Sequence, residues 1–189
     1  GKRKKADYLL THKDGQIPLA IVEAKDATHS VGAGMQQAIE YATILNIPFA
    51  YSSNGSGFIE HDFFTGAETE LKLDEFPSPD QLWKRYLKGK DLNQTQERII
   101  TEPDYFDVFT NKKPRYYQWI AINKTLEAVA KGQDRILLVM ATGTGKTYLS
   151  AFDVKQFNPE RVLFVAHREH ILQKSLQEYR DLIDMEPQH

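Results

Sequence analysis

The sequence predicts an α/β protein in two parts: a mixed sheet with helices in the first half, followed by the start of a parallel α/β domain. Two extended runs, Ala6 to His12 and Pro18 to Lys25, flank an Asp-Gly turn signal and predict an antiparallel hairpin. The apolar run Ile136 to Met140 does not alternate, which is typical of a parallel strand covered on both faces. A glycine-rich turn and a helix follow it, and a second apolar run, Arg161 to Ala166, completes a β–α–β order.

Length and composition exclude several classes of protein. The 189 residues suffice for two modest cores, and we expect two domains. The chain has no cysteine, which excludes disulfides, thiolate metal sites and cysteine nucleophiles, and fits a reducing, cytoplasmic setting. No apolar stretch approaches the roughly 20 residues that span a bilayer. The net charge of -2 gives no general electrostatic argument for nucleic-acid binding.

The second strand of the hairpin ends in an acid and a lysine two residues apart. The period of two places Glu23 and Lys25 on one face of the strand, with Ala24 on the other. The pattern alone is weak, because Glu70-Leu-Lys72 and Asp153-Val-Lys155 have the same form.

The surroundings of the first pair distinguish it from the other two. Asp7 on the partner strand would lie directly across from Glu23 if the turn contained an odd number of residues, whereas a two-residue turn would place them on opposite faces. We therefore expect an odd turn, such as Asp14-Gly15-Gln16. In the next predicted helix, Gln37 and Tyr41 lie four residues apart on one face.

The rest of the first part reads as ordinary elements. We expect a helix over 31–45, a core strand over 47–51, a turn over 52–57, an alternating edge strand over 58–64 and a short helix over 80–87. The polar stretch 88–113 is typical of a connector on the surface.

These residues together resemble the PD-(D/E)xK nuclease superfamily, in particular its members with a QxxxY motif after the Glu-x-Lys strand. The resemblance implies that Asp7 and Glu23 bind Mg²⁺, joined by the Ala24 carbonyl, and that Lys25 positions or activates the attacking water. Ala6 stands where the motif name has proline, which supplies geometry and no ligand.

The QxxxY part of the resemblance implies that Gln37 and Tyr41 orient the DNA backbone or the side chains of the active site. The alternative is an ordinary charged hairpin edge packed by an amphipathic helix. Many relatives also use an acidic residue from a preceding helix, which here would lie before Gly1, so we expect that helix to be missing from this chain.

The turn after the first apolar run is predicted to be a nucleotide-phosphate loop; the alternative is a glycine-rich turn that happens to precede a helix. Its glycines let the backbone approach phosphate oxygens, and its N–H groups and the helix N-terminus supply positive partial charge. Lys146 would reach the β- and γ-phosphates, and the Thr147 hydroxyl would bind Mg²⁺. The nucleotide-binding residues expected of this loop are Thr142, Gly143, Thr144, Gly145, Lys146 and Thr147.

The sequence around the loop resembles superfamily 2 helicases. Met140 stands where the general pattern has glycine, as is common in that superfamily. Arg115-Tyr-Tyr-Gln118 resembles their adenine-reading glutamine motif and precedes a helix that Gly132 would end; a core-helix glutamine is the alternative. His167 to Lys174 resembles the segment that these motors place against DNA.

The order of these motifs resembles the restriction (R) subunit of type I restriction enzymes. The resemblance implies a subunit that uses ATP and Mg²⁺ to translocate double-stranded DNA and to cleave it, with methyltransferase (M) and specificity (S) subunits as partners. Two alternatives stay open: a nuclease-fused superfamily 2 helicase of repair or another defence system, and a non-enzymatic first domain that docks an ATPase.

We expect three segments: a PD-(D/E)xK nuclease domain over residues 1–86, a linker over 87–114 and the first part of a RecA-like motor lobe over 115–189. No Asp-Glu-x-His or Asp-Glu-Ala-Asp run, which a complete motor of this kind needs for Mg²⁺ and water, occurs in the sequence. We therefore expect a fragment that binds ATP weakly and lacks ATPase activity of its own.

Overall fold

The computed structural model describes residues 6–12, 16–102 and 114–183. The chain forms two compact units, Gly1–Glu97 and Arg98–His189. Residues 13–15 of the expected turn and 103–113 of the expected linker lie outside the described residues. Within the described residues, no helix combines the length and the apolar character that crossing a bilayer requires.

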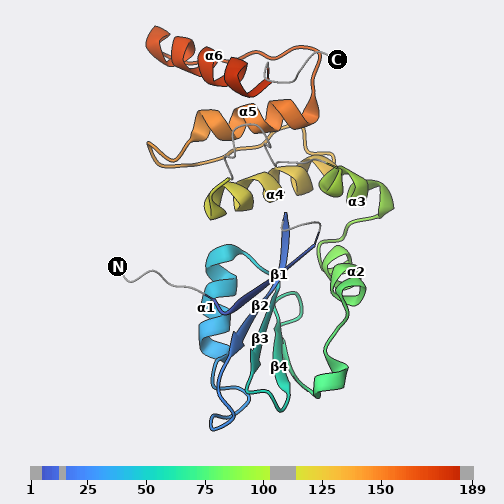
Figure 1. Ribbon diagram of the computed structural model, residues 1–189. Helices are drawn as coiled ribbons and strands as arrows, with labels where there is room; N and C mark the ends of the chain where they lie inside the picture. Colours follow the sequence, from blue (N-terminus) through green and yellow to red (C-terminus); the bar gives the residue numbers. More distant parts are fainter. Residues whose placement is uncertain (1–5, 13–15, 103–113, 184–189) are drawn as a thin grey trace, which may run out of the picture. The chain divides into compact units, whose positions relative to one another are not determined.

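The first unit is built on one five-stranded mixed sheet with the strands in sequence order (Figure 1). The β2–β3 pair is parallel and the other pairs are antiparallel. The predicted hairpin and core strand are confirmed. The predicted edge position of the fourth strand is wrong, because a further strand pairs with its outer side. The strands are β1 (Tyr8–His12), β2 (Ile17–Ala24), β3 (Phe49–Ser53), β4 (Phe58–Asp62) and β5 (Ala67–Leu71).

The register of β1 against β2 depends on an irregularity between Leu10 and Thr11. Near the turn, His12 pairs with Ile17, so four positions separate the strands and the predicted odd turn is wrong. Farther along, Tyr8 pairs with Val22, because Leu19 is an extra residue on β2. This bulge shifts the register by one residue, and the shifted register, continued one position further, sets Asp7 opposite Glu23.

One face of the sheet packs against helix α1 (Met35–Leu45). Alternation along β2 and β3 turns apolar side chains toward this helix, whose buried positions recur at the spacing of one helical face. The helix ends at Asn46, a residue in the left-handed conformation with φ of 55°. The core on this face consists of Ile21, Met35, Ala38, Ala42, Ile47 and Ala50.

Helix α2 (Pro79–Gly89) packs against the opposite face, after the short 3₁₀ helix η1 (Leu73–Glu75). Ser78 caps α2 by accepting a hydrogen bond from the Gln81 backbone N–H, and Pro79 occupies the first turn, where no N–H is needed. The Trp83 ring stacks on His12 with a centroid distance of 3.9 Å. The first unit is therefore a three-layer α/β/α arrangement.

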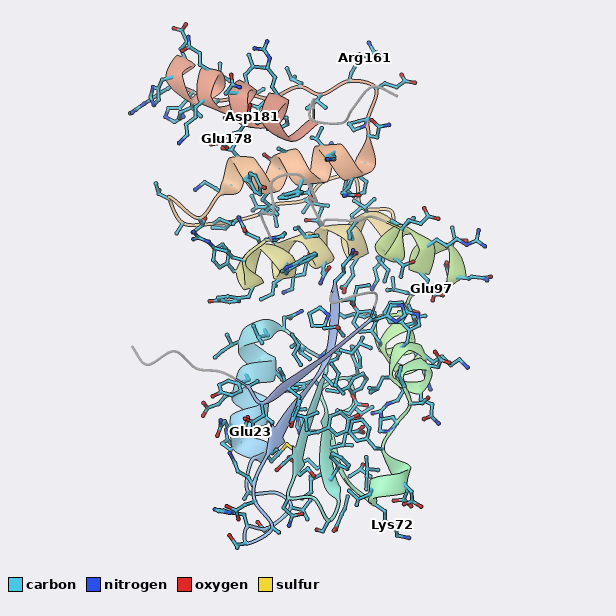
Figure 2. The ribbon with its side chains drawn as sticks, viewed as in Figure 1. Glu23, Lys72, Glu97, Arg161, Glu178 and Asp181 are labelled. Atoms are coloured by element: carbon cyan, nitrogen blue, oxygen red, sulfur yellow. The ribbon has the colours of Figure 1, made fainter. Side chains whose placement is uncertain are left out.

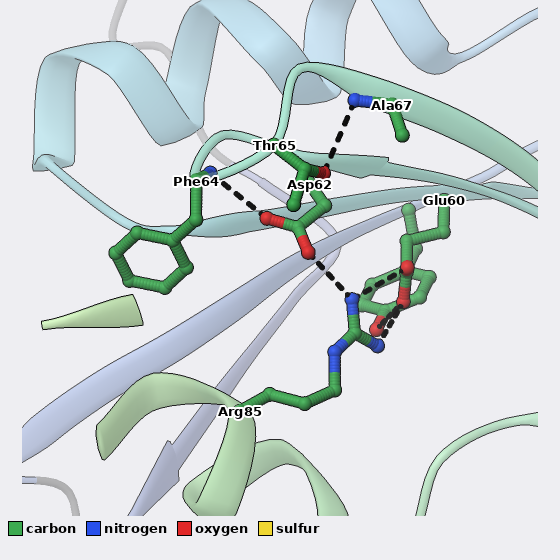
Figure 3. Close-up of polar contacts among 7 residues, drawn as sticks. Glu60, Asp62, Phe64, Thr65, Ala67 and Arg85 are labelled. Carbon is green, nitrogen blue, oxygen red and sulfur yellow. Dashed lines mark hydrogen bonds and ion pairs between the residues drawn. The ribbon is translucent and has the colours of Figure 1, made fainter. Parts of the chain in front are cut away.

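A partly buried ionic network joins α2 to the sheet (Figure 3). The Arg85 guanidinium donates to both carboxylate oxygens of Glu60 at 2.7 Å and to Asp62 Oδ2 at 3.0 Å. The Tyr51 hydroxyl donates to Glu60 at 2.5 Å, and burial raises the pKa of this hydroxyl well above its ordinary value. Arg85 also lies 4.5 Å from the centroid of the Phe49 ring. A bidentate arginine with this geometry fixes the rotation of α2 against the strands.

Arg85→Leu should lower the free energy of unfolding of the first unit by about 3 kcal/mol, because it leaves the buried Glu60 carboxylate without its counter-charge. Urea unfolding followed by tryptophan fluorescence measures the loss. Lys84→Met, an exposed position on the same helix, is the control and should change stability little. Equal losses in the two variants would show that the network does not stabilise the unit.

In the second unit, the described residues from 114 to 183 form three helices that follow one another along the chain. Helix α5 contacts both α4 and α6 and lies between them (Figure 1). The predicted helix before the first apolar run and the predicted helix after the glycine-rich loop are confirmed. The helices are α4 (Tyr116–Ala130), α5 (Lys146–Phe157) and α6 (Glu169–Ile183); a further helix, α3 (Gln94–Thr101), crosses the boundary between the units.

The two predicted strands of the second unit are wrong for the part of the chain that the structure describes. Residues 135–141 and 161–166 do not form strands, because neither run is hydrogen-bonded to a partner strand among the described residues. Leu137 and Val139 are 86% and 87% exposed, and Leu163 is 88% exposed. A parallel strand is stable when both of its faces are covered, and these faces are open.

Asp153 on α5 is a partly buried acid whose Oδ1 atom has no hydrogen-bond partner among the described residues. Burial raises the pKa of its carboxyl to about 7. The folded chain therefore keeps a proton there at pH values where the unfolded chain has already released it. Stability contributed by this group is highest below about pH 4 and falls as the pH rises to about 7.

Asp153→Asn should make the second unit more stable at pH 8 by about 2 kcal/mol and should change little at pH 4. The figure is about half of the roughly 4 kcal/mol that a shift of three pH units implies, since Asp153 is only partly buried. Urea unfolding followed by circular dichroism at both pH values tests this. The exposed Asp134→Asn is the control, and an equal effect of Asp153→Asn at both pH values would contradict the assignment.

Candidate active site and phosphate-binding loop

The acid and the lysine predicted from the hairpin meet at the end of β2. Glu23 is 2% exposed and lies on β2 beside α1 (Figure 2). The Lys25 ammonium donates to Glu23 Oε1 at 2.9 Å. This hydrogen bond raises the pKa of Lys25 above its ordinary value, so the side chain is a charged ammonium here.

A chain of hydrogen bonds continues from Lys25 onto α1. The ammonium also donates to Gln37 Oε1 at 3.3 Å, and Gln37 Nε2 donates to the Tyr41 hydroxyl oxygen at 3.2 Å. Gln37 and Tyr41 lie one helical turn apart, so one face of α1 presents both. The structure therefore brings together four of the five predicted residues by direct contact.

Asp7, the fifth residue, joins the site through the backbone. Its Oδ2 atom accepts a hydrogen bond from the Ala24 N–H at 2.9 Å. Its negative charge also acts on Lys25 and contributes to the raised pKa of the ammonium. Asp7 thus reaches the strand end where Glu23 and Lys25 lie, which agrees with the shifted register of the hairpin.

The carboxylates at this strand end fit a divalent cation. Glu23 Oε2 is buried and has no hydrogen-bond partner among the described residues, although Oε1 is bound by Lys25. A buried carboxylate oxygen without a donor is costly unless a cation or water binds it. The described residues contain no group of three or more His, Asp, Glu or Cys side chains that could bind a metal. Two carboxylates suit Mg²⁺, which keeps several waters and completes its shell with substrate phosphates.

The two other acid-x-lysine pairs have different surroundings. Glu70 lies exposed on β5, the edge strand at the other end of the sheet from β1, and Lys72 follows that strand. Asp153 and Lys155 lie on helix α5, where residues two apart do not face each other. Neither pair has a hairpin partner that corresponds to Asp7.

The predicted phosphate loop precedes α5 and folds back on its own carbonyl groups. Gly143 and Gly145 have φ of 79° and 83°, the left-handed region that favours glycine. The Lys146 ammonium donates to the carbonyl oxygens of Met140 and Ala141 at 3.1 and 2.9 Å. An anion could take the place of these carbonyls as the partner of the ammonium.

A cavity of about 480 Å³ lies against the loop. Its lining includes five of the six predicted loop residues, Thr142, Gly143, Gly145, Lys146 and Thr147, together with residues of α6. Thr144 is the sixth; its hydroxyl donates to the Ala141 carbonyl at 2.7 Å.

Gln118 contacts the loop directly. Its Nε2 atom donates to the Thr144 carbonyl at 3.1 Å, and its Oε1 atom accepts from the Arg115 N–H at 2.8 Å, which caps α4. Each end of the amide makes a hydrogen bond to the protein, so adenine would bind through the second N–H donor of Nε2 and the second lone pair of Oε1. Adenine reading by Gln118 stays a prediction.

Two residues beside Glu23 were not predicted from the sequence. Ser52 on β3 is completely buried next to Glu23, and Gly34 closes over both side chains at the start of α1. A short polar residue inside an apolar strand and a glycine at the position of a helix cap are the signals that the sequence offered.

Comparisons with known proteins show what the chain is similar to. The sequence pattern of the type III restriction enzyme res subunit family (ResIII) matches residues 111–188. The type I restriction enzyme EcoAI endonuclease subunit of Escherichia coli is 52% identical over 175 residues, which cover 87% of this chain and 21% of the relative. The EcoKI endonuclease subunit of Escherichia coli strain K12 is 26% identical over 233 residues, covering 96% of this chain and 19% of the relative.

A solved structure gives the same result. It is a fragment assigned to an HsdR subunit of a type I restriction enzyme from Vibrio vulnificus YJ016, with a TM-score of 0.73 and 41% identity. The match covers 85% of this chain and 30% of that chain. The predicted mixed sheet of the first part and the overall α/β class are confirmed.

The fold and the two candidate sites define an α/β protein in which an acid-and-lysine strand end is followed by a predicted nucleotide-phosphate loop. Over most of its length, this chain is similar to endonuclease subunits of type I restriction enzymes. It spans about a fifth of the length of the curated relatives that it matches.

Proposed function

We propose that the chain carries the nuclease site and the nucleotide-phosphate loop of the motor and nuclease subunit of a type I restriction enzyme. The proposed activity of the whole protein is ATP-dependent translocation and double-strand cleavage of DNA. The observation that carries the proposal is the convergence of Asp7, Glu23, Lys25, Gln37 and Tyr41 at one strand end, where one buried carboxylate oxygen has no partner. The three segments expected from the sequence, 1–86, 87–114 and 115–189, are part of this proposal.

In the proposed nuclease reaction, Asp7, Glu23 and the Ala24 carbonyl would hold Mg²⁺. The ion would lower the pKa of a bound water and stabilise the charge on the phosphate that is attacked. The Lys25 ammonium lies 2.9 Å from Glu23 Oε1 and can donate to the attacking water or to a phosphate oxygen.

Gln37 and Tyr41 would hold the lysine in place in this reaction. Gln37 accepts a hydrogen bond from the ammonium and donates one to Tyr41, so the amide has a defined orientation. The ammonium therefore has two fixed acceptors, Glu23 and Gln37, and one remaining donor for the reaction.

The loop at residues 142–147 would bind the phosphates of ATP and a second Mg²⁺. Lys146 would exchange the carbonyls of Met140 and Ala141 for phosphate oxygens, and Thr147 would bind the ion. Gln118, which touches the loop at Thr144, is in place to couple recognition of adenine to the conformation of the loop.

The proposed partners are double-stranded DNA and the methyltransferase and specificity subunits, and the proposed location is the cytoplasm. Homology to endonuclease subunits of type I restriction enzymes supports the proposal of a complex of several subunits. Base-specific recognition would belong to the partner subunits.

Glu23→Gln and Lys25→Ala in the full-length protein, assembled with its partner subunits, should each lower the rate of DNA cleavage at least 100-fold. Both variants should keep DNA-stimulated ATP hydrolysis, because they leave the phosphate loop intact. A gel assay of linearised plasmid and a phosphate-release assay measure the two activities.

Lys146→Ala is the matched control for that experiment, since it should abolish ATP hydrolysis and the cleavage that depends on it. Its first unit should bind Mn²⁺ as the unaltered chain does. Cleavage at the normal rate by Glu23→Gln would show that the first unit is not the nuclease.

A further inference from the structure

Gly34 and Ser52 lie next to the Glu23 side chain. Neither residue contributes a reacting group to the proposed nuclease reaction. We propose that Gly34 and Ser52 are positioning residues that hold the Glu23 carboxylate in place for the metal ion. This inference rests on the proposed nuclease function and adds to it the means by which the carboxylate is oriented.

Ser52 links the strand next to Glu23 with the turn before α1. It is completely buried, and in the parallel pairing of β2 with β3 it is the direct partner of Glu23. Its hydroxyl donates to the Val31 carbonyl at 2.6 Å and accepts from the Gly34 N–H at 3.0 Å. One hydroxyl therefore satisfies two backbone groups and fixes the turn over the site.

The loop between β2 and α1 has one further anchor on the same strand end. Asn54 Nδ2, just beyond β3, donates to the His29 carbonyl at 2.8 Å. Hydrogen bonds at His29, Val31 and Gly34 thus bind the loop to the end of β3. These contacts with β3 help to determine the path of the loop.

Gly34 is required by space and not by backbone conformation. Its φ of -92° and ψ of -7° are open to any residue, and alanine is a better helix former than glycine. A Cβ atom at Gly34, however, would lie 2.9 Å from Glu23 Cγ, 3.2 Å from Glu23 Cβ and 3.0 Å from Ser52 Oγ. The glycine therefore lets the helix start pack directly on the stem of the glutamate.

This packing links the position of Glu23 to that of Gln37, the hydrogen-bond acceptor of Lys25. Gly34 precedes Gln37 by three residues, so the position of the first turn of α1 sets both the space for Glu23 and the acceptor for Lys25. A shift of this turn by a few tenths of an ångström would move Glu23 Oε2, the oxygen without a partner.

The test compares Gly34→Ala and Ser52→Ala in the full-length protein with its partner subunits, by measuring DNA cleavage against Mg²⁺ concentration. Each variant should raise the Mg²⁺ concentration for half-maximal cleavage about 10- to 100-fold, the usual effect of removing a group that orients a metal ligand. At saturating Mg²⁺ the cleavage rate should recover to within about threefold, and ATP hydrolysis should be unchanged.

Ser53→Ala is the matched control for Ser52→Ala. Ser53 is the adjacent buried serine of β3, and its hydroxyl donates to the Gly57 carbonyl at 2.8 Å and accepts from the Gly55 N–H at 3.2 Å, away from Glu23. It should lower the melting temperature without changing the dependence on Mg²⁺. Circular dichroism of each variant reports whether it has folded, and if Gly34→Ala does not fold, Ser52→Ala decides.

The outcomes separate this inference from the function on which it rests. If Ser52→Ala and Gly34→Ala show the same dependence on Mg²⁺ as Ser53→Ala while Glu23→Gln is inactive, the positioning role of Gly34 and Ser52 is wrong and the nuclease function stands. If Glu23→Gln cleaves DNA normally, the nuclease function itself fails. A raised Mg²⁺ requirement in both Gly34→Ala and Ser52→Ala supports the proposal.

Discussion

The register of β1 against β2 is the constraint on which the candidate nuclease site depends. Because side chains alternate along a strand, a slip of one residue would turn Asp7 to the face opposite Glu23. The four positions between His12 and Ile17 would by themselves place Asp7 and Glu23 on opposite faces of the hairpin. The extra residue Leu19 on β2 shifts the register by one residue and brings them to the same face. The hydrogen bond from the Ala24 N–H to Asp7 then holds the corrected register at the far end of the hairpin.

The two faces of the sheet in the first unit have different tasks. On one face, α1 packs with small residues and brings a glutamine and a tyrosine to the lysine of the strand end. On the other face, α2 is held by Arg85 and its two carboxylate partners, so the strands that carry the site are fixed from behind. Polar groups are buried on both faces, but among the described residues of this unit only Glu23 has a fully buried carboxylate oxygen without a hydrogen-bond partner.

Much of the first unit could be predicted from the sequence, because its signals are local. The turn between two extended runs, the Glu23 and Lys25 spacing and the Gln37 and Tyr41 spacing each reflect one period of one element. Three features depend on contacts between distant segments, which the periodicity of one helix or strand does not reveal. They are the bulge at Leu19, the pairing of β5 with β4, and the packing of Ser52 and Gly34 beside Glu23. The phosphate loop and its helix were predicted for the same local reason, whereas the apolar runs beside it need partner strands before they can form a sheet.

The most direct test of the central claim is the position of a metal ion in crystals of the chain soaked in Mn²⁺, located by anomalous scattering. The account predicts one strong peak in the first unit, at about 2.1 Å from Glu23 Oε2 and within the same range of an Asp7 carboxylate oxygen. A peak elsewhere in that unit, or none at saturating Mn²⁺ with Asp7, Glu23 and Lys25 well ordered, would contradict it.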